Sequence, residues 1–320
     1  MADVVAGLAV FGAVIAAGWL LVRTRAVPAD ADGVLTRVCF FAATPALLVT
    51  TLSRADLTAV VSRATAVAVA AELAAIISAW CLHRLALRRT TAEATIGALA
   101  SGYVNAANLG IPVAVLVLGD AATIAPILLL QLLVLTPITF TVLDAVTRRG
   151  NPSRLATLTV PLRNPLLWGV VAGTAANLGG VRLEYWCGGY PAQGLEMLGR
   201  VAVPLMMLAL GMSLAGAPRP LRSPEPDALV RGAGRRSGLW LAVGWKLAVM
   251  PGLAVVVGLA AGLSGAQLLT PVVTAALPTA QNVFMYASRY GAAKDLARDA
   301  VLLTTAGFVP VVLLAAALLH

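Results

Sequence analysis

Apolar stretches long enough to cross a lipid bilayer recur along the whole chain, with short polar segments between them. A hydrocarbon core about 30 Å thick requires roughly 20 apolar residues per helix. Hydrophobic residues make up 60% of the 320 residues and charged residues 12%, which leaves too few polar side chains to cover a water-soluble domain. The sequence therefore predicts an all-α integral membrane protein with ten transmembrane helices, at residues 4–22, 34–52, 57–82, 95–118, 121–146, 165–181, 194–214, 239–263, 267–288 and 297–319.

The basic residues are distributed unevenly between the two sides that these spans define. Eighteen of the 23 Lys and Arg residues fall on one side and four on the other, and Lys246 lies within a span. Because short loops rich in Lys and Arg stay in the cytoplasm, we expect both termini to be extracytoplasmic, in the plasma membrane. The net charge of +9 then reflects membrane orientation and contact with lipid headgroups, and not nucleic-acid binding.

Ten spans divide into two sets of five, so the second set enters the membrane from the opposite side. We expect residues 1–147 to form the first five-helix repeat, residues 148–163 a cytoplasmic link, and residues 164–320 the second repeat. Inverted repeats of this kind underlie many secondary transporters, which bind their substrates near the midplane at broken helices.

Proline stands near carboxamide side chains in both the fourth and the ninth span. Proline kinks or unwinds a helix, and in lipid the freed backbone groups need partners in protein or water. Two crossing helices broken in this way would direct half-helix N-termini, which carry partial positive charge, toward an anion. The alternative is a pair of ordinary kinks bridged by asparagine. The residues expected to form the substrate site are Asn105, Asn108, Gly110, Pro112, Pro278, Gln281 and Asn282.

Glu72 and Lys246 are charged residues deep inside the third and the eighth span. Each costs about 2.5–3.5 kcal/mol on insertion scales, so each requires a partner or an aqueous cavity. Their depths, about 15 and 11 Å from the cytoplasmic ends of their spans, favour an ion pair that either takes part in transport or only fixes helix register. Polar side chains in the fifth and tenth spans, suited either to sodium coordination or to ordinary packing, are Gln131, Thr136, Thr304 and Thr305.

Four groups of residues, spread over nearly the whole chain, are similar to motifs of a known family. They are Thr44-Pro45-Ala46-Leu47-Leu48; Asn105-x-x-x-x-Gly110-x-Pro112 followed by Gly119-Asp120; Val203-Pro204-Leu205-Met206-Met207-Leu208-Ala209-Leu210-Gly211; and Pro278-x-Ala280-x-Asn282 with Arg289-Tyr290-Gly291. Together they resemble the auxin efflux carrier family, which includes plant PIN-formed carriers and bacterial permeases. The short link between the halves resembles the bacterial branch.

This resemblance implies a ten-helix fold in which the fourth and ninth helices cross. It implies a scaffold of the first, second, sixth and seventh helices, and a transport domain of helices three to five and eight to ten that moves as an elevator. It also implies carriage of small organic acids, which are auxin in plants and dicarboxylates such as malate or malonate in bacteria. The expected function is a permease for mono- or dicarboxylates, with a homodimer left open.

Other protein classes fit the sequence less well. The chain has two histidines, His83 and His320, and no GxSxG, HExxH or Walker sequence, which argues against an enzyme. Its three cysteines have no metal-binding spacing. An antiporter on this scaffold would carry an acidic residue in the middle of the fifth span, where residues 132–136 are uncharged. A bile-acid-type sodium symporter and a channel are the alternatives. We expect no cofactor, and coupling to protons or to sodium is open.

Overall fold

The computed structural model describes residues 2–28, 30–55, 57, 62–147, 162, 164–216 and 228–319. Regular structure in these ranges is helical, apart from an isolated bridge between Val104 and Thr279. The helical segments that are long and apolar enough to cross a membrane are Ala31–Arg54, Arg63–Ala86, Ala121–Thr147, Tyr190–Ala215, Arg236–Ala260 and Lys294–Leu319. The chain is therefore a multi-pass, all-helical membrane protein.

Further apolar helices are shorter, and they overlap the predicted first, fourth, sixth and ninth spans. They are Gly12–Arg23, Ala106–Leu118, Pro165–Leu178 and Gly265–Ala276. The link expected at residues 148–163 lies outside the described residues, except for residue 162, and His320 lies outside them too.

The helices form two compact units, which are described separately. The first unit comprises Met1–Val61, Ala107–Ala125 and Pro161–Pro218, and the second comprises Ser62–Ala106, Pro126–Val160 and Arg219–His320.

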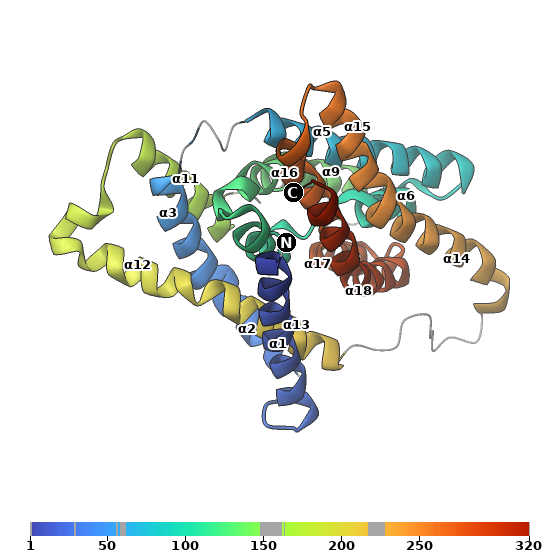
Figure 1. Cartoon of the computed structure of the whole chain (residues 1–320). Coiled ribbons are helices and arrows are strands. Elements are labelled where there is room, and N and C mark those ends of the chain that lie inside the picture. The colour runs from blue at the N-terminus through green and yellow to red at the C-terminus, as the bar shows by residue number, and fades with distance from the viewer. Residues whose placement is uncertain are drawn as a thin grey trace. The chain divides into compact units, whose positions relative to one another are not determined.

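The first unit is built around two helix pairings. Helix α1 packs along α13. Helix α3 contacts both α11 and α12, as Figure 1 shows. The unit contains α1 (Ala2–Arg23), α2 (Ala31–Val38), η1 (Cys39–Ala43), α3 (Thr44–Arg54), α7 (Ile111–Val113), η4 (Ala114–Leu118), η5 (Ala121–Ile124), α11 (Pro165–Leu178), η8 (Leu183–Gly189), α12 (Tyr190–Arg200) and α13 (Ala202–Gly216).

Two glycines let α1 and α13 approach each other closely. A Cβ atom on Gly18 would collide with the carbonyl oxygen of Leu208, and one on Gly211 would collide with that of Ile15. Small residues commonly occupy helix contacts in membranes, where packing replaces the hydrophobic effect as the force that associates helices. This glycine pair therefore explains why the two helices fit together here.

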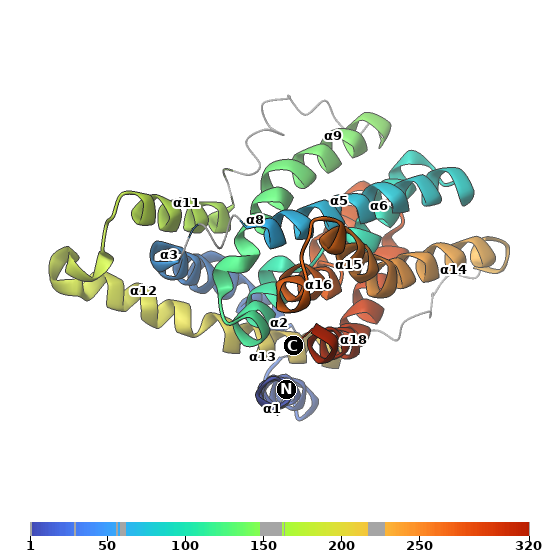
Figure 2. The same cartoon turned by 45° about the horizontal axis from the view of Figure 1, so that its top comes forward.

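The second unit packs α5 against α6, α15 and α16 (Figure 2), and packs α18 against α14, α16 and α17, of which α17 is labelled in Figure 1. Its elements are α5 (Arg63–Cys81), η2 (Leu82–Ala86), α6 (Thr91–Gly102), α8 (Ala125–Leu130), η6 (Gln131–Leu135), α9 (Thr136–Thr147), α14 (Ala228–Gly244), η9 (Trp245–Val249), α15 (Met250–Ala260), η10 (Gly265–Leu268), α16 (Leu269–Ala276), α17 (Gln281–Tyr290) and α18 (Lys294–Leu319). A segment η3 (Ala106–Gly110) follows α6 along the chain.

Local sequence signals set the starts of α5 and α6. Ser62 and Thr65 form a capping box before α5, and Thr90 and Glu93 form one before α6. In each box the side chains satisfy backbone N–H groups that the first helical turn leaves without partners.

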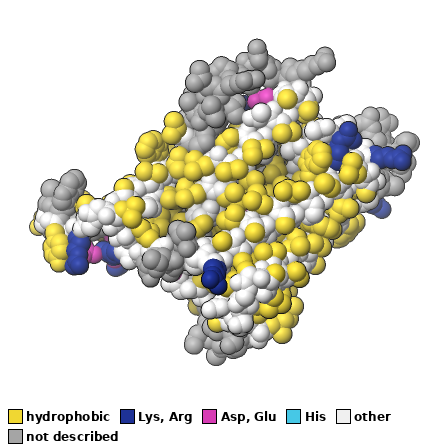
Figure 3. All heavy atoms as spheres, turned by 90° about the horizontal axis from the view of Figure 1, so that it is seen from above, with side chains coloured by type: hydrophobic (Ala, Val, Ile, Leu, Met, Phe, Trp, Pro, Cys, Tyr) yellow, Lys and Arg dark blue, Asp and Glu magenta, His cyan; other side chains and the backbone are white. Residues whose placement is uncertain are grey.

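The outer surface is suited to lipid. Hydrophobic side chains are spread across the middle of the face shown in Figure 3, and the few charged side chains visible on it lie mainly toward its edges. Exposed residues on the described helices include Phe41, Ile77, Val256 and Leu318. A surface of this kind needs a partner that is itself apolar, and a bilayer supplies one.

The break expected at Pro112 is placed differently in the structure. Pro112 lies inside α7, within a helical stretch that continues from Ala106 to Leu118. The π-helical segments on both sides, η3 and η4, give the chain the wider turns that accommodate a residue without an N–H. The fourth span instead breaks where α6 ends at Gly102, well before the proline.

Candidate functional site

The fourth span is interrupted by three non-helical residues, Tyr103 to Asn105, all of which are buried. The N–H of Tyr103 still donates to the carbonyl of Leu99 at 2.8 Å, which completes the last turn of α6. The N–H of Asn105 donates instead to the carbonyl of Pro278, at 2.8 Å. The chain thus leaves one helix and bonds to a distant segment before the next helical turn begins.

The ninth span is interrupted in the same way. Helix α16 ends at Ala276, and α17 begins at Gln281. In the interval, the N–H of Ala280 donates to the carbonyl of Tyr103 at 3.1 Å, and Thr279 forms an antiparallel bridge with Val104. We call residues 103–105 and 277–280 the crossover. Each interruption supplies the backbone partners that the other lacks, as buried peptide groups in a membrane require.

Thr279 and Thr304 fasten the crossover to its neighbouring helices. The hydroxyl of Thr279 donates to the carbonyl of Ala100 at 2.6 Å, near the end of α6. The N–H of Thr279 donates to the hydroxyl oxygen of Thr304 at 3.1 Å, and that hydroxyl donates to Ala300 at 2.7 Å. Thr304 is therefore a partner of the crossover, whereas neighbouring Thr305 is half-buried and makes no hydrogen bond to it among the described residues.

Glu72, on α5, reaches the crossover from the first half of the chain. Its Oε1 atom accepts hydrogen bonds from the N–H of Val104 at 3.3 Å and from Nε2 of Gln131 at 2.8 Å. The same Nε2 atom donates to the carbonyl of Val104 at 2.9 Å. The Oε2 atom of Glu72 is buried without a hydrogen-bond partner among the described residues. Glu72 and Gln131 together bind both backbone groups of Val104.

Lys246, on η9, is fully buried and binds the ninth span. Its Nζ atom donates to the carbonyl oxygen of Ala275 at 2.7 Å and contacts the sulfur of Met250 at 3.1 Å. Ala275 lies in the last turn of α16, where carbonyl groups lack helical partners and the helix dipole favours a cation. Lys246 therefore neutralises a helix C-terminus next to the crossover.

The direct ion pair expected between Glu72 and Lys246 is not formed. No nitrogen–oxygen contact within 4.0 Å joins these two described residues. Each side chain instead has a backbone partner that competes with the pairing, Val104 for Glu72 and Ala275 for Lys246. Glu72 binds the crossover at Val104, and Lys246 binds the last turn of the helix that leads into it.

The remaining expected site residues divide between the two units. Asn105, Pro278, Gln281 and Asn282 belong to the second unit, with Asn105 and Pro278 buried and Asn282 exposed. The other three expected residues come shortly after Asn105 in the sequence and belong to the first unit: Asn108, Gly110 and Pro112.

Tyr103, Thr136 and Tyr286 form a chain of hydroxyl groups beside the crossover. Thr136 lies 3.3 Å from the hydroxyl of Tyr103 and 3.2 Å from that of Tyr286. The ring of Phe140 contacts that of Tyr286 edge to face, with centroids 5.0 Å apart. The sequence reasoning missed Tyr103, Tyr286 and Thr279. The signal available for Tyr286 was its position four residues after Asn282, on the same side of a helix.

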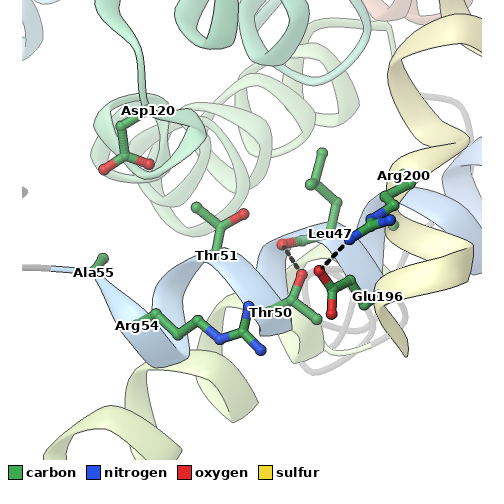
Figure 4. A pocket seen from close by; sticks show the side chains of 9 residues that line it. Leu47, Thr50, Thr51, Arg54, Ala55, Asp120, Glu196 and Arg200 are labelled. Carbon is green, nitrogen blue, oxygen red and sulfur yellow. Dashed lines mark hydrogen bonds and ion pairs between the residues drawn. The ribbon is translucent and has the colours of Figure 1, made fainter. Parts of the chain in front are cut away.

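A separate cavity of about 390 Å³ lies in the first unit, between α3, α12 and the chain after η4 (Figure 4). Arg200 pairs with Glu196 at 2.8 Å, Arg54 pairs with Glu184 at 2.8 Å, and the carboxylate of Asp120 caps the N–H of Ala122. The charged side chains that line the cavity already have partners within the chain. The cavity is therefore a weaker candidate for a substrate site than the crossover.

Comparison with known proteins agrees with a transport role. A family model described as "Membrane transport protein" matches residues 4–157 and 154–316. A protein of Rhizobium meliloti (strain 1021), named "Putative malonate transporter", is 29% identical over 320 aligned positions. The alignment covers 95% of this chain and 92% of the relative.

Proposed function

Because the chain belongs to the auxin efflux carrier family of membrane transport proteins, we propose that it is a secondary transporter for small organic anions, namely mono- or dicarboxylates. Membership of this family makes it a transporter and not an enzyme. The name of the Rhizobium relative supports a short dicarboxylate such as malonate as the first substrate to test.

The observation that carries the proposal is the paired interruption of two helices at Val104 and Thr279. A new helix begins directly after it, at Gln281, and its first turn holds Asn282, which is exposed. The N-terminus of a helix offers unpaired N–H groups and partial positive charge, both of which favour a carboxylate. A carboxamide in the same turn adds a further N–H donor.

The division into two units supports elevator-type alternating access. One unit contains the helices expected to form the scaffold, together with residues 107–125, and the other contains the remaining helices. The contacts of Glu72 and Gln131 with the crossover, and that of Lys246 with Ala275 next to it, all lie inside the second unit. In our proposal these residues hold the crossover rigid while the second unit carries the substrate.

We also propose that both termini are extracytoplasmic, as the distribution of Lys and Arg favours, and that the protein uses no cofactor. A homodimer in the plasma membrane is the assembly to test. The alternative function, a bile-acid-type sodium symporter, would need oxygen ligands near the crossover. The oxygens of Gln131 and Thr304 are candidates, although the donor groups of both side chains bond to protein.

Proteoliposomes containing the purified protein test the proposal. We expect saturable uptake of radiolabelled malonate, accelerated by unlabelled malonate inside the vesicles, without a sodium gradient. Asn282→Ala should raise the KM, whereas Gln193→Ala, which removes an exposed carboxamide from α12, should not. Strict dependence on sodium would favour the symporter, uptake without counterflow would favour a channel, and no uptake of any carboxylate would overturn the proposal.

A further inference from the structure

The exposed side of α17 carries a cation two turns beyond the crossover. Asn282 and Arg289 are seven residues apart, so they lie on the same side of the helix, and both are exposed, as is Met285 between them. At 1.5 Å per residue their Cα atoms are separated by about 10 Å along the helix axis. This side of α17 therefore carries an amide group and, two turns further along the helix axis, a guanidinium group.

An aromatic support fixes the position of the guanidinium. The Cζ atom of Arg289 lies 5.0 Å from the ring centroid of Phe140 and 5.5 Å from that of Tyr290. Contacts of this kind are attractive because the ring face is electronegative. They hold the guanidinium against α9, so the group is ordered before any ligand arrives.

The support is itself held in place. The hydroxyl of Tyr290 donates to Oδ1 of Asp144 at 2.7 Å, and the ring of Phe140 packs against Tyr286. Tyr286 in turn contacts Thr136, the residue bonded to Tyr103 at the crossover. A continuous set of side chains thus fixes the position of Arg289 relative to the crossover, inside a single unit.

A guanidinium has five N–H donors in a planar fork, which matches the two oxygens of a carboxylate. Lys246, the buried cation near the crossover, is committed to the carbonyl of Ala275. A dicarboxylate has a carboxylate at each end, so one end can accept from the amide of Asn282 while the other accepts from the guanidinium of Arg289. We propose that Arg289 binds the second carboxylate of a short dicarboxylate and so determines selectivity over monocarboxylates.

This inference rests on the proposed function and extends it to a specificity-determining residue. Its test compares the binding of malonate with that of propionate, which has the same number of carbons and one carboxylate. Affinities are measured on the purified full-length protein by ligand-induced thermal stabilisation. The variants are Arg289→Gln, Arg289→Lys and the control Lys294→Gln, which removes another exposed cation that faces an aromatic ring, that of Phe284 at 5.8 Å.

We expect Arg289→Gln to weaken malonate binding about tenfold or more, as the loss of a charge-assisted hydrogen bond predicts, and to leave propionate binding within about twofold. Arg289→Lys should weaken malonate binding less, because it keeps the charge and loses the fork. Equal effects on both ligands, no effect on either, or the same selectivity change in Lys294→Gln would overturn the inference.

Wild-type protein that binds neither ligand would instead overturn the proposed function. If Arg289→Gln does not fold, the malonate-to-propionate ratio of Arg289→Lys decides.

Discussion

Lys246 donates a hydrogen bond of 2.7 Å to the carbonyl oxygen of Ala275, in the last turn of the half-helix that leads into the crossover. A lysine in the apolar interior of a membrane protein is costly, and this contact places its charge at the negative end of a helix dipole. The contact links a residue of the eighth span to the geometry of the ninth.

Lys246→Met should reduce malonate uptake by about tenfold or more, because the carbonyl of Ala275 loses its partner and the end of α16 is no longer fixed. Uptake is measured in proteoliposomes and normalised to the amount of folded protein. The control, Lys294→Met, removes a cation that is exposed in the structure and should retain most of the uptake. Unchanged uptake in Lys246→Met would remove this residue from the transport mechanism.

Both hydrogen bonds to Glu72 are accepted by its Oε1 atom. Substitutions can therefore test separately whether the protein needs this hydrogen-bond acceptor and whether it needs the negative charge. Glu72→Gln keeps an oxygen that accepts from the N–H of Val104 and from Gln131, and should melt within a few degrees of the wild type. Glu72→Leu leaves the buried N–H of Val104 without an acceptor, at a cost of about 1–3 kcal/mol, and reduces Gln131 to its bond with the carbonyl of Val104, so this variant should melt at a clearly lower temperature.

The same two variants then separate structure from transport. Glu72→Gln protein that is folded but inactive would show that the charge is needed for the cycle, whereas an active variant would limit Glu72 to positioning Val104. Equal melting temperatures for Glu72→Gln and Glu72→Leu would contradict the role assigned to the two hydrogen bonds.

Sequence patterns predicted one of the two helix breaks correctly and misplaced the other. Pro278 lies two residues after the end of α16, in the non-helical interval before α17, where a residue without an N–H is tolerated. Pro112 is accommodated inside a helix, and the actual break ends α6 at Gly102. What stabilises that break is the pairing of Val104 with Thr279, a contact between residues 175 positions apart, which local sequence signals cannot reveal.

The sequence predicted that Glu72 and Lys246 belong to the site, but it did not predict which groups they bind. Burial cost alone selects Glu72 and Lys246, because a charge within an apolar span needs a partner. Opposite charge then suggested that they pair with each other. The backbone groups released by the crossover compete for both side chains, and these groups become available only when the tertiary structure is known.

Two neighbouring threonines on α18 offer a matched test of the crossover. The hydroxyl oxygen of Thr304 accepts from the N–H of Thr279 at 3.1 Å. Thr304→Val should therefore destabilise the protein by about 1–3 kcal/mol, because it leaves a buried N–H without an acceptor. Thr305→Val is the same chemical change one residue away and should stay within about 0.5 kcal/mol. Chemical denaturation in detergent measures the difference, and equal effects would contradict the bond between Thr279 and Thr304.

The close approach of α1 and α13 leads to a prediction for the first unit. Gly211→Ala places a methyl group against the backbone carbonyl of Ile15, which cannot move aside as a flexible side chain could. Overpacking of this kind typically costs about 1–3 kcal/mol. Gly12→Ala, at an exposed position on α1 with nothing within 4 Å, should instead stabilise the helix by about 0.5–1 kcal/mol. Opposite shifts in the melting temperature of the two variants, measured in the same detergent, are the expected result. If Gly211→Ala melts at or above the wild-type temperature, α1 and α13 do not pack closely through this glycine.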